Sequence, residues 1–590
     1  MINLVSSSRK LVLDRGKKNI KILSLIFENN INLKNSKSNY HWDDNKKLKN
    51  DLKKIYKIYY KFIKFLTERL NSVHKTNKPE KYWEILIWRW LTRYIIYYYD
   101  RWEIVSSLSK IYKKKSISLN FINFKEEKFI PYNTEDWCLR CVMSEDWDHW
   151  VYSEIFKSKK NFKFSYVNKF KIKPVPKFIF QKKIKNPISK LKFIYSPFLN
   201  KKIISQNLGF SRKTPIPLML FLKKMHYIDD NLFSDFNFNF NSEIRNNLSQ
   251  PTNLFKTPFE KFLISQLKYN FPTIFLENYK LAQNKINKSN LPSKPKLIIT
   301  SLDDIFNEPF KFYVAKNVIA GSKLFHLQHG GSYGTSDDYP VEKIQIGLCD
   351  KFFSWGWSDN KKVIPGFCQK TIGIKIRQTK KTEGVIIPIF DWNLNPGDIS
   401  GGRPRNLNDI NLYIKNLNIF YSKLNPKIKK KSAFKFFDYS NCDYSNCKDL
   451  YPKYVLNNLM NKFKKKNFFH SSESTFHYLD KYKINVETVN STGYLETLNL
   501  NLPTILIFDS QFCRIRRNVK KYFSLLEKSN ILFKNPHSAA NFINKNYDNI
   551  DNWWNSKRVQ SAVKIFSNKF ARSTDNPYTF LEKLKKYNSF

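Results

Sequence analysis

The chain has 590 residues, a formal net charge of +54 at pH 7 and seven cysteines. This length exceeds what one hydrophobic core usually supports, so it predicts two or three domains. The odd number of cysteines argues against a disulfide framework, and the N-terminus lacks the apolar run and cleavage site of a signal peptide, which together favour a cytoplasmic location.

The positive charge has two explanations that the sequence leaves open. It indicates either an anionic partner or a bias of the genome toward AT-rich codons, because Lys, Asn, Ile, Phe and Tyr are abundant together. A basic nucleic-acid-binding protein is the alternative that charge alone suggests. The chain contains no recognised DNA- or RNA-binding module, so we expect no nucleic-acid partner.

Residues 1–150 read as a helical N-terminal region. Apolar residues recur at helical spacing over residues 51–70. The most hydrophobic stretch, residues 82–102, carries too many charges for a lipid-spanning helix of about 20 residues. We expect a buried or interfacial helix there, with these charged members: Glu84, Arg89, Arg93, Asp100 and Arg101.

A lysine-rich segment follows at residues 155–228, where the sequence contains no acidic residue. Its prolines and lack of periodicity are typical of a solvated insertion. The alternative is a basic face that contacts phosphate-bearing lipid or an anionic acceptor, and contact with lipid would place the protein peripherally at the inner face of the membrane. We expect this segment to be inserted in an N-terminal Rossmann-like domain over residues 151–380.

From residue 295 the pattern alternates between strands and helices. "PKLIIT" (295–300) and "KLFHLQ" (323–328) read as strands on either side of a helix that ends near Gly321, which predicts a β-α-β unit. "KFFSWGW" (351–357) reads as the next strand, and the polar stretch after it as an interdomain connection.

A second alternating series predicts a C-terminal Rossmann-like domain over residues 381–575 that holds a nucleotide donor. Helices are expected over residues 549–573 and a tail over 576–590. The predicted strands are residues 384–390, 432–437, 484–489 and 503–508.

The stretch "HLQHGGSYG" (326–334) follows a predicted strand and should lie at the carboxyl end of a parallel sheet, where open α/β folds bind ligands. Gly330 and Gly331 permit a sharp turn and close approach to a ligand. His329 can act as a base, an acid or a phosphate partner. The alternative is an ordinary tight turn with a hydrogen-bonded histidine.

A second candidate is "NSTGYLETLNLNLPTI" (490–505), between two predicted strands. Asn490, Ser491 and Thr492 are good N-cap residues, so this helix start predicts a phosphate or diphosphate site. The Glu496 carboxylate, about one turn into the helix, could accept hydrogen bonds from ribose hydroxyls. The alternative is an ordinary capped helix with a surface glutamate.

No metal or other cofactor is expected. Cys138 and Cys141 have half of a zinc spacing, but no matching pair follows. "GDISGGRPRN" (397–406) lacks the P-loop pattern and reads as a surface loop, in which Arg403 and Arg405 are candidate phosphate contacts.

These motifs occur in a known order. The chain resembles transferases encoded in bacterial O-antigen and surface-polysaccharide loci. The motifs that carry this resemblance are "QHGGSYG", "DKFFSWGW", "NSTGYLETLNLNLPTI", "NIDNWWNSKRVQSAVKIFSNKFARSTDNP", and "YWEILIWRWL" with "YYYDRW". The resemblance implies an α/β fold of the GT-B-like type, with two Rossmann-type domains facing a cleft and the donor held mainly by the C-terminal domain.

One departure from that family is "FKFFDYSNCDYSNC". The family tends to have an arginine-containing strand there, and Lys435 is at best a partial substitute.

We therefore expect a glycosyltransferase that uses a nucleotide-activated sugar donor and a glycan or lipid-linked acceptor, with a CDP-polyol phosphotransferase as the alternative. His329 would deprotonate the acceptor hydroxyl or touch the donor phosphate. This requires residues 329 and 490–492 to share one crevice. The expected donor-binding residues are Gln328, Gly330, Gly331, Tyr333, Asn490, Ser491, Thr492 and Glu496.

Overall fold

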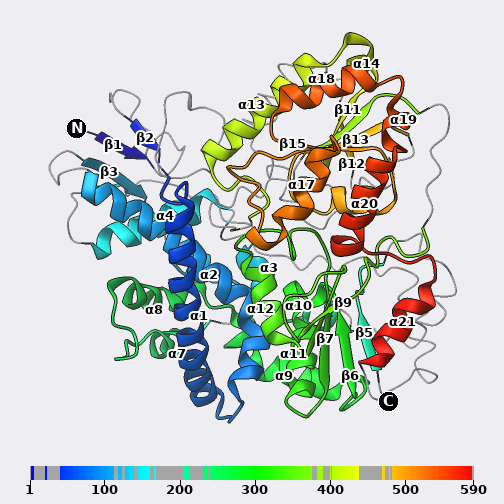
Figure 1. Cartoon of the computed structure of the whole chain (residues 1–590). Coiled ribbons are helices and arrows are strands. Elements are labelled where there is room, and N and C mark those ends of the chain that lie inside the picture. Colours follow the sequence, from blue (N-terminus) through cyan, green and yellow to red (C-terminus); the bar gives the residue numbers. More distant parts are fainter. Residues whose placement is uncertain are drawn as a thin grey trace.

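The structure is a computed structural model that describes residues 2–5, 20–22, 40–111, 117–122, 126–138, 142, 144–159, 165–167, 203–210, 228, 230–236, 240–374, 382–389, 399, 401–437, 468–471, 478 and 481–587. A layer of long helices packs beside two units that each contain a parallel sheet (Figure 1).

The first of these sheets has five parallel strands in the order β5-β6-β7-β8-β9. Its strands are short apolar runs buried on both faces, as expected for a parallel sheet covered by helices. The helices in this unit are α10 (Asp303–Phe306), α11 (Glu308–Val318) and α12 (Pro340–Leu348). The strands are β5 (Ile203–Gln206), β6 (Leu297–Thr300), β7 (Lys323–Leu327), β8 (Lys351–Ser354) and β9 (Val363–Pro365).

The second sheet has six parallel strands in the order β12-β11-β10-β13-β14-β15. The strands are β10 (Val385–Pro388), β11 (Ala433–Phe437), β12 (Phe468–Ser471), β13 (Ile484–Glu487), β14 (Thr504–Ile507) and β15 (Leu532–Phe533). The helices of this unit and the C-terminus are α13 (Leu407–Lys423), α14 (Pro426–Lys431), α16 (Gly493–Asn499), α17 (Lys520–Lys528), α18 (Pro536–Asn546), α19 (Ile550–Trp554), α20 (Lys557–Phe570) and α21 (Pro577–Lys586).

The helical layer is built on α1 (Asn45–His74) and α2 (Glu80–Ile111). Trp83, Trp88 and Trp90 on α2 are fully buried, and α2 packs against both α1 and α11, so this layer shares its core with the first sheet unit. The prediction of a buried helix over residues 82–102 is confirmed. The other helices of the layer are α3 (Thr134–Asp136), α4 (Glu145–Ser158), α7 (Ser242–Leu248), α8 (Pro258–Asn270) and α9 (Tyr279–Lys288).

A small parallel sheet near the N-terminus was not predicted from the sequence. Its strand order is β2-β1-β3-β4, and its strands are β1 (Ile2–Val5), β2 (Ile20–Ile22), β3 (Ile117–Ile122) and β4 (Ser165–Val167).

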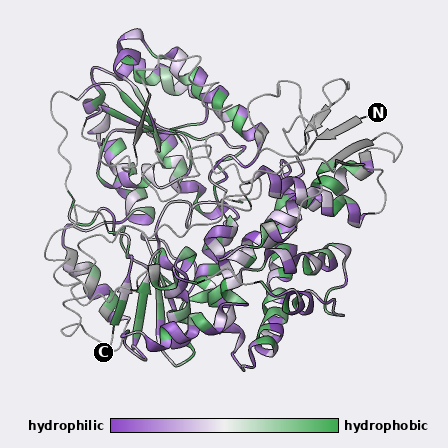
Figure 2. Cartoon of the chain, turned by 180° about the vertical axis from the view of Figure 1, so that it is seen from behind, coloured by the Kyte–Doolittle hydropathy of each residue, from purple (hydrophilic) through white to green (hydrophobic). Residues whose placement is uncertain are grey.

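The predicted fold class, α/β with two Rossmann-type domains of the GT-B-like kind and a helical N-terminal region, is confirmed. Figure 2 shows why the chain folds in this way: apolar strands lie inside each unit, and the surrounding helices have an apolar and a polar face.

Several strands of the two larger sheets occur where the sequence predicted none, namely β5, β9, β12 and β15. β9 lies in the stretch interpreted as an interdomain connection, because its three residues are too few to show a pattern and gain their partners only from β8. β5 lies in the lysine-rich segment 155–228 and pairs with β6. Most of that segment lies outside the described residues. Both interpretations of its charge, a solvated insertion and a basic face, therefore concern residues that the structure does not describe.

Candidate functional site

Two loops from different domains touch where their strands end. We call residues 328–334 the HGG loop, which follows β7, and residues 490–492 the NST loop, which lies after β13 and before α16. The amide N–H of Gly331 donates to Thr492 Oγ1 at 2.9 Å, and the Ser332 hydroxyl donates to the Asn490 carbonyl at 2.8 Å. The carboxyl ends of the two sheets therefore face each other, and the sequence-predicted motifs from both domains meet there.

Glycines make this contact possible. A Cβ atom on Gly331 would lie 2.0 Å from the Ser491 carbonyl oxygen, and one on Gly330 would lie 3.0 Å from Thr492 Oγ1. A third loop, residues 401–406, joins at the same place, because a Cβ on Gly402 would lie 2.4 Å from the Asn490 carbonyl oxygen. Gly331 thus permits a contact between the two backbones and Gly330 a contact with the Thr492 side chain, so a ligand has to lie beside these contacts and not within them.

The polar side chains of the NST loop are engaged with the protein. The amide of Asn490 donates to Ser336 Oγ at 3.1 Å, and its oxygen accepts from the Tyr494 hydroxyl at 2.8 Å. Thr492 is the N-cap of α16, but its hydroxyl accepts from Gly331 and makes no capping hydrogen bond. The sequence predicted a phosphate or diphosphate site at this helix start, and in the structure the Thr492 hydroxyl is engaged by the contact with the HGG loop. Ser491 is half-buried beside them.

His329 is held by a chain of hydrogen bonds that fixes its tautomer. Asp304 Oδ2 accepts from the Gln345 amide at 3.0 Å, which turns the Gln345 oxygen toward Tyr333. The Tyr333 hydroxyl donates its single proton to that oxygen at 2.6 Å. Tyr333 can then only accept from His329 Nδ1, at 3.2 Å, so Nδ1 carries the proton and Nε2 keeps a free lone pair.

His326 belongs to the same chain of contacts but lies deeper. Its Nε2 is 3.0 Å from Asp304 Oδ1 and 3.2 Å from Gln345 Nε2. A cavity of about 20 Å³, large enough for one water molecule, borders His326, Asp304 and Gln345. Burial raises the pKa of Asp304, but His326 and the Gln345 hydrogen bond outweigh it and leave that pKa below its ordinary value. His326 therefore stabilises the chain that orients His329.

The charge state of His329 follows from its surroundings. Burial lowers its pKa to about 3, and the neighbouring His326, Lys370 and Arg89 lower this pKa further, whereas Asp304 raises it. His329 is therefore a neutral imidazole at physiological pH. With its proton on Nδ1, Nε2 can accept a hydrogen bond but cannot donate one to a phosphate.

Both polar side-chain atoms of Gln328 are already hydrogen bonded within the protein. Its side-chain oxygen accepts from the Trp355 backbone N–H and from the Trp357 indole, both at 2.9 Å, and its amide donates to the Gly330 carbonyl at 2.8 Å. The side chain is completely buried. Gln328 thus holds the HGG loop against the end of β8. The sequence pattern alone could not distinguish this structural role from the expected role in donor binding.

Glu496 is brought to the domain interface, and its partner was missed by the sequence analysis. Lys370 Nζ lies 3.4 Å from Glu496 Oε1, and the same lysine is close enough to His329 to lower its pKa. Lys370 belongs to the stretch interpreted as an interdomain connection, so no local pattern distinguished it from the other lysines there. Lys370 thus interacts electrostatically with a residue from each domain, His329 and Glu496.

A second buried carboxyl group lies beneath the start of α16. Glu487 ends β13, and a Cβ on Gly493 would lie 2.2 Å from its Oε1 atom. Burial raises the pKa of Glu487 to about 8; the nearby Glu496 also raises it, whereas an Asn485 hydrogen bond and Lys435 oppose the rise. Glu487 is therefore largely protonated at neutral pH and can donate a hydrogen bond. Lys435, which the sequence offered as a partial phosphate contact, is buried beside it.

The domains are also joined directly beside the HGG loop. Ser336 and Ile515 form an antiparallel β-bridge, flanked by backbone hydrogen bonds from Asp337 N to Arg514 O and from Arg516 N to Thr335 O. The Arg516 guanidinium donates to Glu342 Oε1 at 2.5 Å and to the Ser336 carbonyl at 2.7 Å. We call this set of contacts the interdomain bridge.

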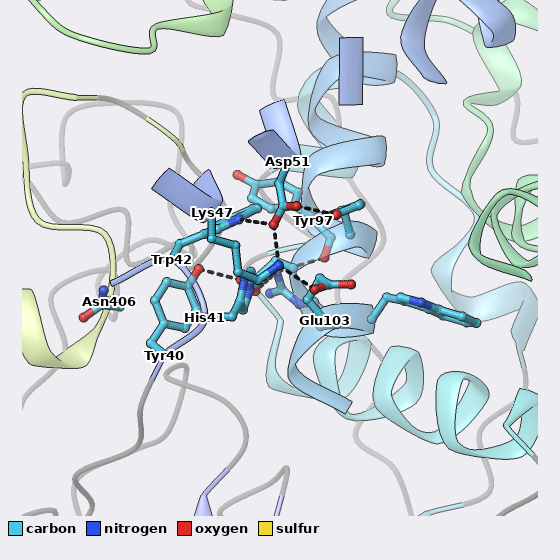
Figure 3. Close-up of polar contacts among 12 residues, drawn as sticks. Tyr40, His41, Trp42, Lys47, Asp51, Tyr97, Glu103 and Asn406 are labelled. Carbon is cyan, nitrogen blue, oxygen red and sulfur yellow. Dashed lines mark hydrogen bonds and ion pairs between the residues drawn. The ribbon is translucent and has the colours of Figure 1, made fainter. Parts of the chain in front are cut away.

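A polar cluster lies where the helical layer meets the C-terminal domain (Figure 3). The Tyr40 hydroxyl donates to Asp100 at 2.5 Å, and His41 Nε2 lies 3.0 Å from the same carboxylate oxygen. The Asn406 amide donates to Asp43 at 3.0 Å, which ties loop 401–406 to the residues just before α1. The loop that the sequence predicted to lie at the surface therefore connects three parts of the chain.

Among the described residues, no group of three or more His, Cys, Asp and Glu side chains could hold a metal ion. Cys138 is a buried free thiol, whereas Cys141 is outside the described residues. None of the described helices is both long and apolar enough to cross a membrane.

Compared with known protein families, residues 27–584 match the family described as LIC12162 family transferase. No curated protein matches the chain.

Among solved structures, the chain is similar to Anabaena HepE in complex with UDP and glucose, with 10% identity, a TM-score of 0.33 and coverage of 66% of this chain and 99% of that one. It is also similar to Acinetobacter baumannii MurG, with 8% identity, a TM-score of 0.29 and coverage of 65% and 99%. The spinosyn rhamnosyltransferase SpnG complexed with thymidine diphosphate gives 10% identity, a TM-score of 0.27 and coverage of 52% and 76%.

Proposed function

Because the chain belongs to the LIC12162 family of transferases, we propose that it transfers a glycosyl group from a nucleotide-activated donor to a growing surface glycan or its lipid-linked precursor. The observation that carries this proposal is the contact between the HGG loop and the NST loop, which brings His329 of one domain and Glu496 of the other to one interface. The resemblance of these two motifs to surface-polysaccharide transferases supports the acceptor class. We place the reaction in the cytoplasm or at the inner face of the membrane.

In this proposal His329 serves the acceptor and not the donor phosphate. Its Nε2 lone pair would accept a hydrogen bond from the acceptor hydroxyl and orient it for attack, while Tyr333 and Gln345 hold the ring. The low basicity of the imidazole makes it an orienting group that takes the proton late, as the new bond forms.

The donor would bind beside the contact of the two loops. Glu496 would accept hydrogen bonds from the donor ribose, in exchange for part of its contact with Lys370. Lys370 would then be released toward the diphosphate, where a cation stabilises the negative charge that grows on the leaving group. The backbone near Gly330, Gly331 and Ser491 would leave room for the transferred sugar.

The test compares donor turnover by His329→Ala and Glu496→Gln with turnover by the wild-type protein, after a thermal-shift screen of nucleotides has selected the donor. We expect His329→Ala to lower kcat by about 100-fold or more, as is typical for loss of a proton acceptor. We expect Glu496→Gln mainly to raise KM for the donor.

Two matched residues serve as controls, His537→Ala and Glu527→Gln, because both are exposed on helices of the C-terminal domain and neither belongs to the two loops. Activity in both site variants equal to that of the controls would refute the assignment. Mass spectrometry of the product separates transfer of a sugar from transfer of a polyol phosphate, which is the alternative chemistry on this architecture.

A further inference from the structure

Two arginines are buried side by side at the junction of the helical layer and the C-terminal domain. Arg405 is in loop 401–406, and Arg514 is in the segment that follows β14. Their side chains are only 3% and 6% exposed. They come from segments far apart in the sequence, so the fold places two positive charges together in a site with little water.

Each guanidinium is satisfied on one edge only. Arg405 Nε lies 3.4 Å from Asp409 Oδ2, and its Nη2 donates to the Gln511 carbonyl at 3.4 Å. Arg514 Nη1 donates to Asn45 Oδ1 at 3.1 Å and lies 3.8 Å from Asp338 Oδ2, beyond hydrogen-bonding distance. Three buried nitrogens, Arg405 Nη1 and Arg514 Nε and Nη2, find no hydrogen-bond partner among the described residues.

The neighbouring carboxylates do not complete these contacts. Asp409 already accepts from the Arg405 backbone N–H at 3.0 Å and from the Gln511 amide at 2.9 Å. Asp337 pairs with Lys49 at 2.5 Å. Burial lowers the pKa of Arg514 to about 10, and the charge of Arg405 lowers it further in spite of these acids. An arrangement of this kind is unfavourable unless an anion fills it.

We propose that Arg405 and Arg514 form a binding site for a phosphate-bearing anion. A phosphate oxygen suits the forked N–H groups of a guanidinium, and two guanidiniums can share one phosphate or bind the two phosphates of a diphosphate. Loop 401–406 also contacts the NST loop through Gly402, so the anion would lie along the same domain interface as the candidate transferase site. The site does not require His329 and goes beyond the proposed function.

The same chemistry could come from the diphosphate of a nucleotide donor or from a phosphate on a lipid-linked acceptor. Inorganic pyrophosphate tests the shared chemistry without choosing between them. Titration of the full-length protein by isothermal titration calorimetry should show saturable binding in the wild type. Arg405→Gln and Arg514→Gln should each weaken the Kd by about ten-fold or more, as expected when hydrogen bonds to a charged group are lost.

Arg558→Gln removes the same charge from an exposed position on α20 and should leave the Kd unchanged. Arg514→Lys keeps the charge but lacks the fork, so it should also bind weakly, and it provides a second measurement if the glutamine variant does not fold. Absence of saturable binding by the wild type, or wild-type affinity in folded Arg405 and Arg514 variants, would overturn the proposal.

Competition by nucleoside diphosphates identifies the source of the phosphate. Competition that requires both arginines assigns the site to the donor. Nucleotide binding that is unaffected in the arginine variants, while pyrophosphate binding is lost, assigns it to the acceptor. His329→Ala should bind pyrophosphate as the wild type does. Pyrophosphate binding therefore tests the arginine site separately from the transferase proposal, and either one can fail without the other.

Discussion

At the scale of single residues, the site combines ionisable groups whose charge is set by burial. His329 has a pKa of about 3 and Glu487 one of about 8, so the histidine is neutral and the carboxyl group largely keeps its proton at neutral pH. Both shifts remove charge near the two loops, where Lys370 and Glu496 form an ion pair. Catalysis in such a site would begin from neutral partners that gain charge only during reaction.

The Glu487 shift predicts how stability depends on pH. The folded state keeps this proton up to a pH of about 8, whereas the unfolded chain releases it near the ordinary value of 4.5. The folded state thus binds more protons within this window, and the contribution of Glu487 to the free energy of unfolding falls as pH rises through it, by at most about 1.4 kcal/mol per pH unit.

Glu487→Gln stays neutral at every pH. The stability of this variant relative to the wild type should therefore increase between pH 4.5 and 8 and be constant below that window. Urea unfolding at several pH values measures the difference in the free energy of unfolding between the variant and the wild type. The opposite contribution of His329 is present in both proteins and cancels in this difference. Glu527→Gln, at an exposed position, should show no such trend; a flat difference for Glu487→Gln would contradict the buried, protonated state.

At the scale of elements, the decisive feature is a loop contact between backbones that side chains would prevent. Gly331→Ala would place a methyl carbon 2.0 Å from the Ser491 carbonyl oxygen, and neither backbone can yield without moving its loop. We expect a loss of about 1–3 kcal/mol in the free energy of unfolding, as in overpacked cores, and a large fall in donor turnover.

Gly347→Ala is the matched control for this change. Gly347 lies in α12 of the same domain, and an added Cβ there would meet no atom within 4 Å. Alanine favours helices, so this variant should be as stable as the wild type or slightly more stable. Equal urea-unfolding midpoints and equal turnover for the two variants would show that the loop contact is less tight than described.

Much of the fold was predictable because its strands are apolar runs bounded by turn residues. The strands over 297–300, 323–327 and 504–507 were predicted from that pattern. β9 and β15 were not, since strands of three and two residues depend on their neighbours in the sheet.

The candidate site was predictable in part. The motifs around His329 and Thr492 mark loops at strand ends, and the sequence analysis expected them to meet. The partners of those loops were not predictable from local patterns. Lys370 is one of many lysines, and Arg514 has no motif around it, so both depend on contacts that only the folded chain creates.

At the scale of the whole molecule, the domains are held together by the interdomain bridge in addition to the loop contact. Arg516 spans it, with Glu342 as its partner. Burial raises the pKa of Glu342, although Arg516 and a Gly334 N–H oppose the rise. Removing Arg516 would leave a buried carboxylate with one remaining donor, which is unfavourable.

Arg516→Ala should therefore loosen the domains. We expect faster hydrogen exchange at the amides of Asp337 and Arg516, whose backbone N–H groups cross the interface, and a loss of roughly 1–3 kcal/mol in the free energy of unfolding. Hydrogen-exchange mass spectrometry of peptides over residues 335–338 and 514–517 measures the first effect. Arg517→Ala removes an exposed neighbouring arginine and should change neither; equal exchange in both variants would remove Arg516 from this role.

The glycine contacts have one further consequence. A Cβ on Gly331 would lie 2.0 Å from the Ser491 carbonyl oxygen, and one on Gly402 would lie 2.9 Å from Ser332 Oγ, so each domain places a glycine at this contact. Peptide groups are stiff, whereas side chains change rotamer freely. At this point the distance between the two domains is thus set by a peptide group of one domain that rests directly against the backbone of the other.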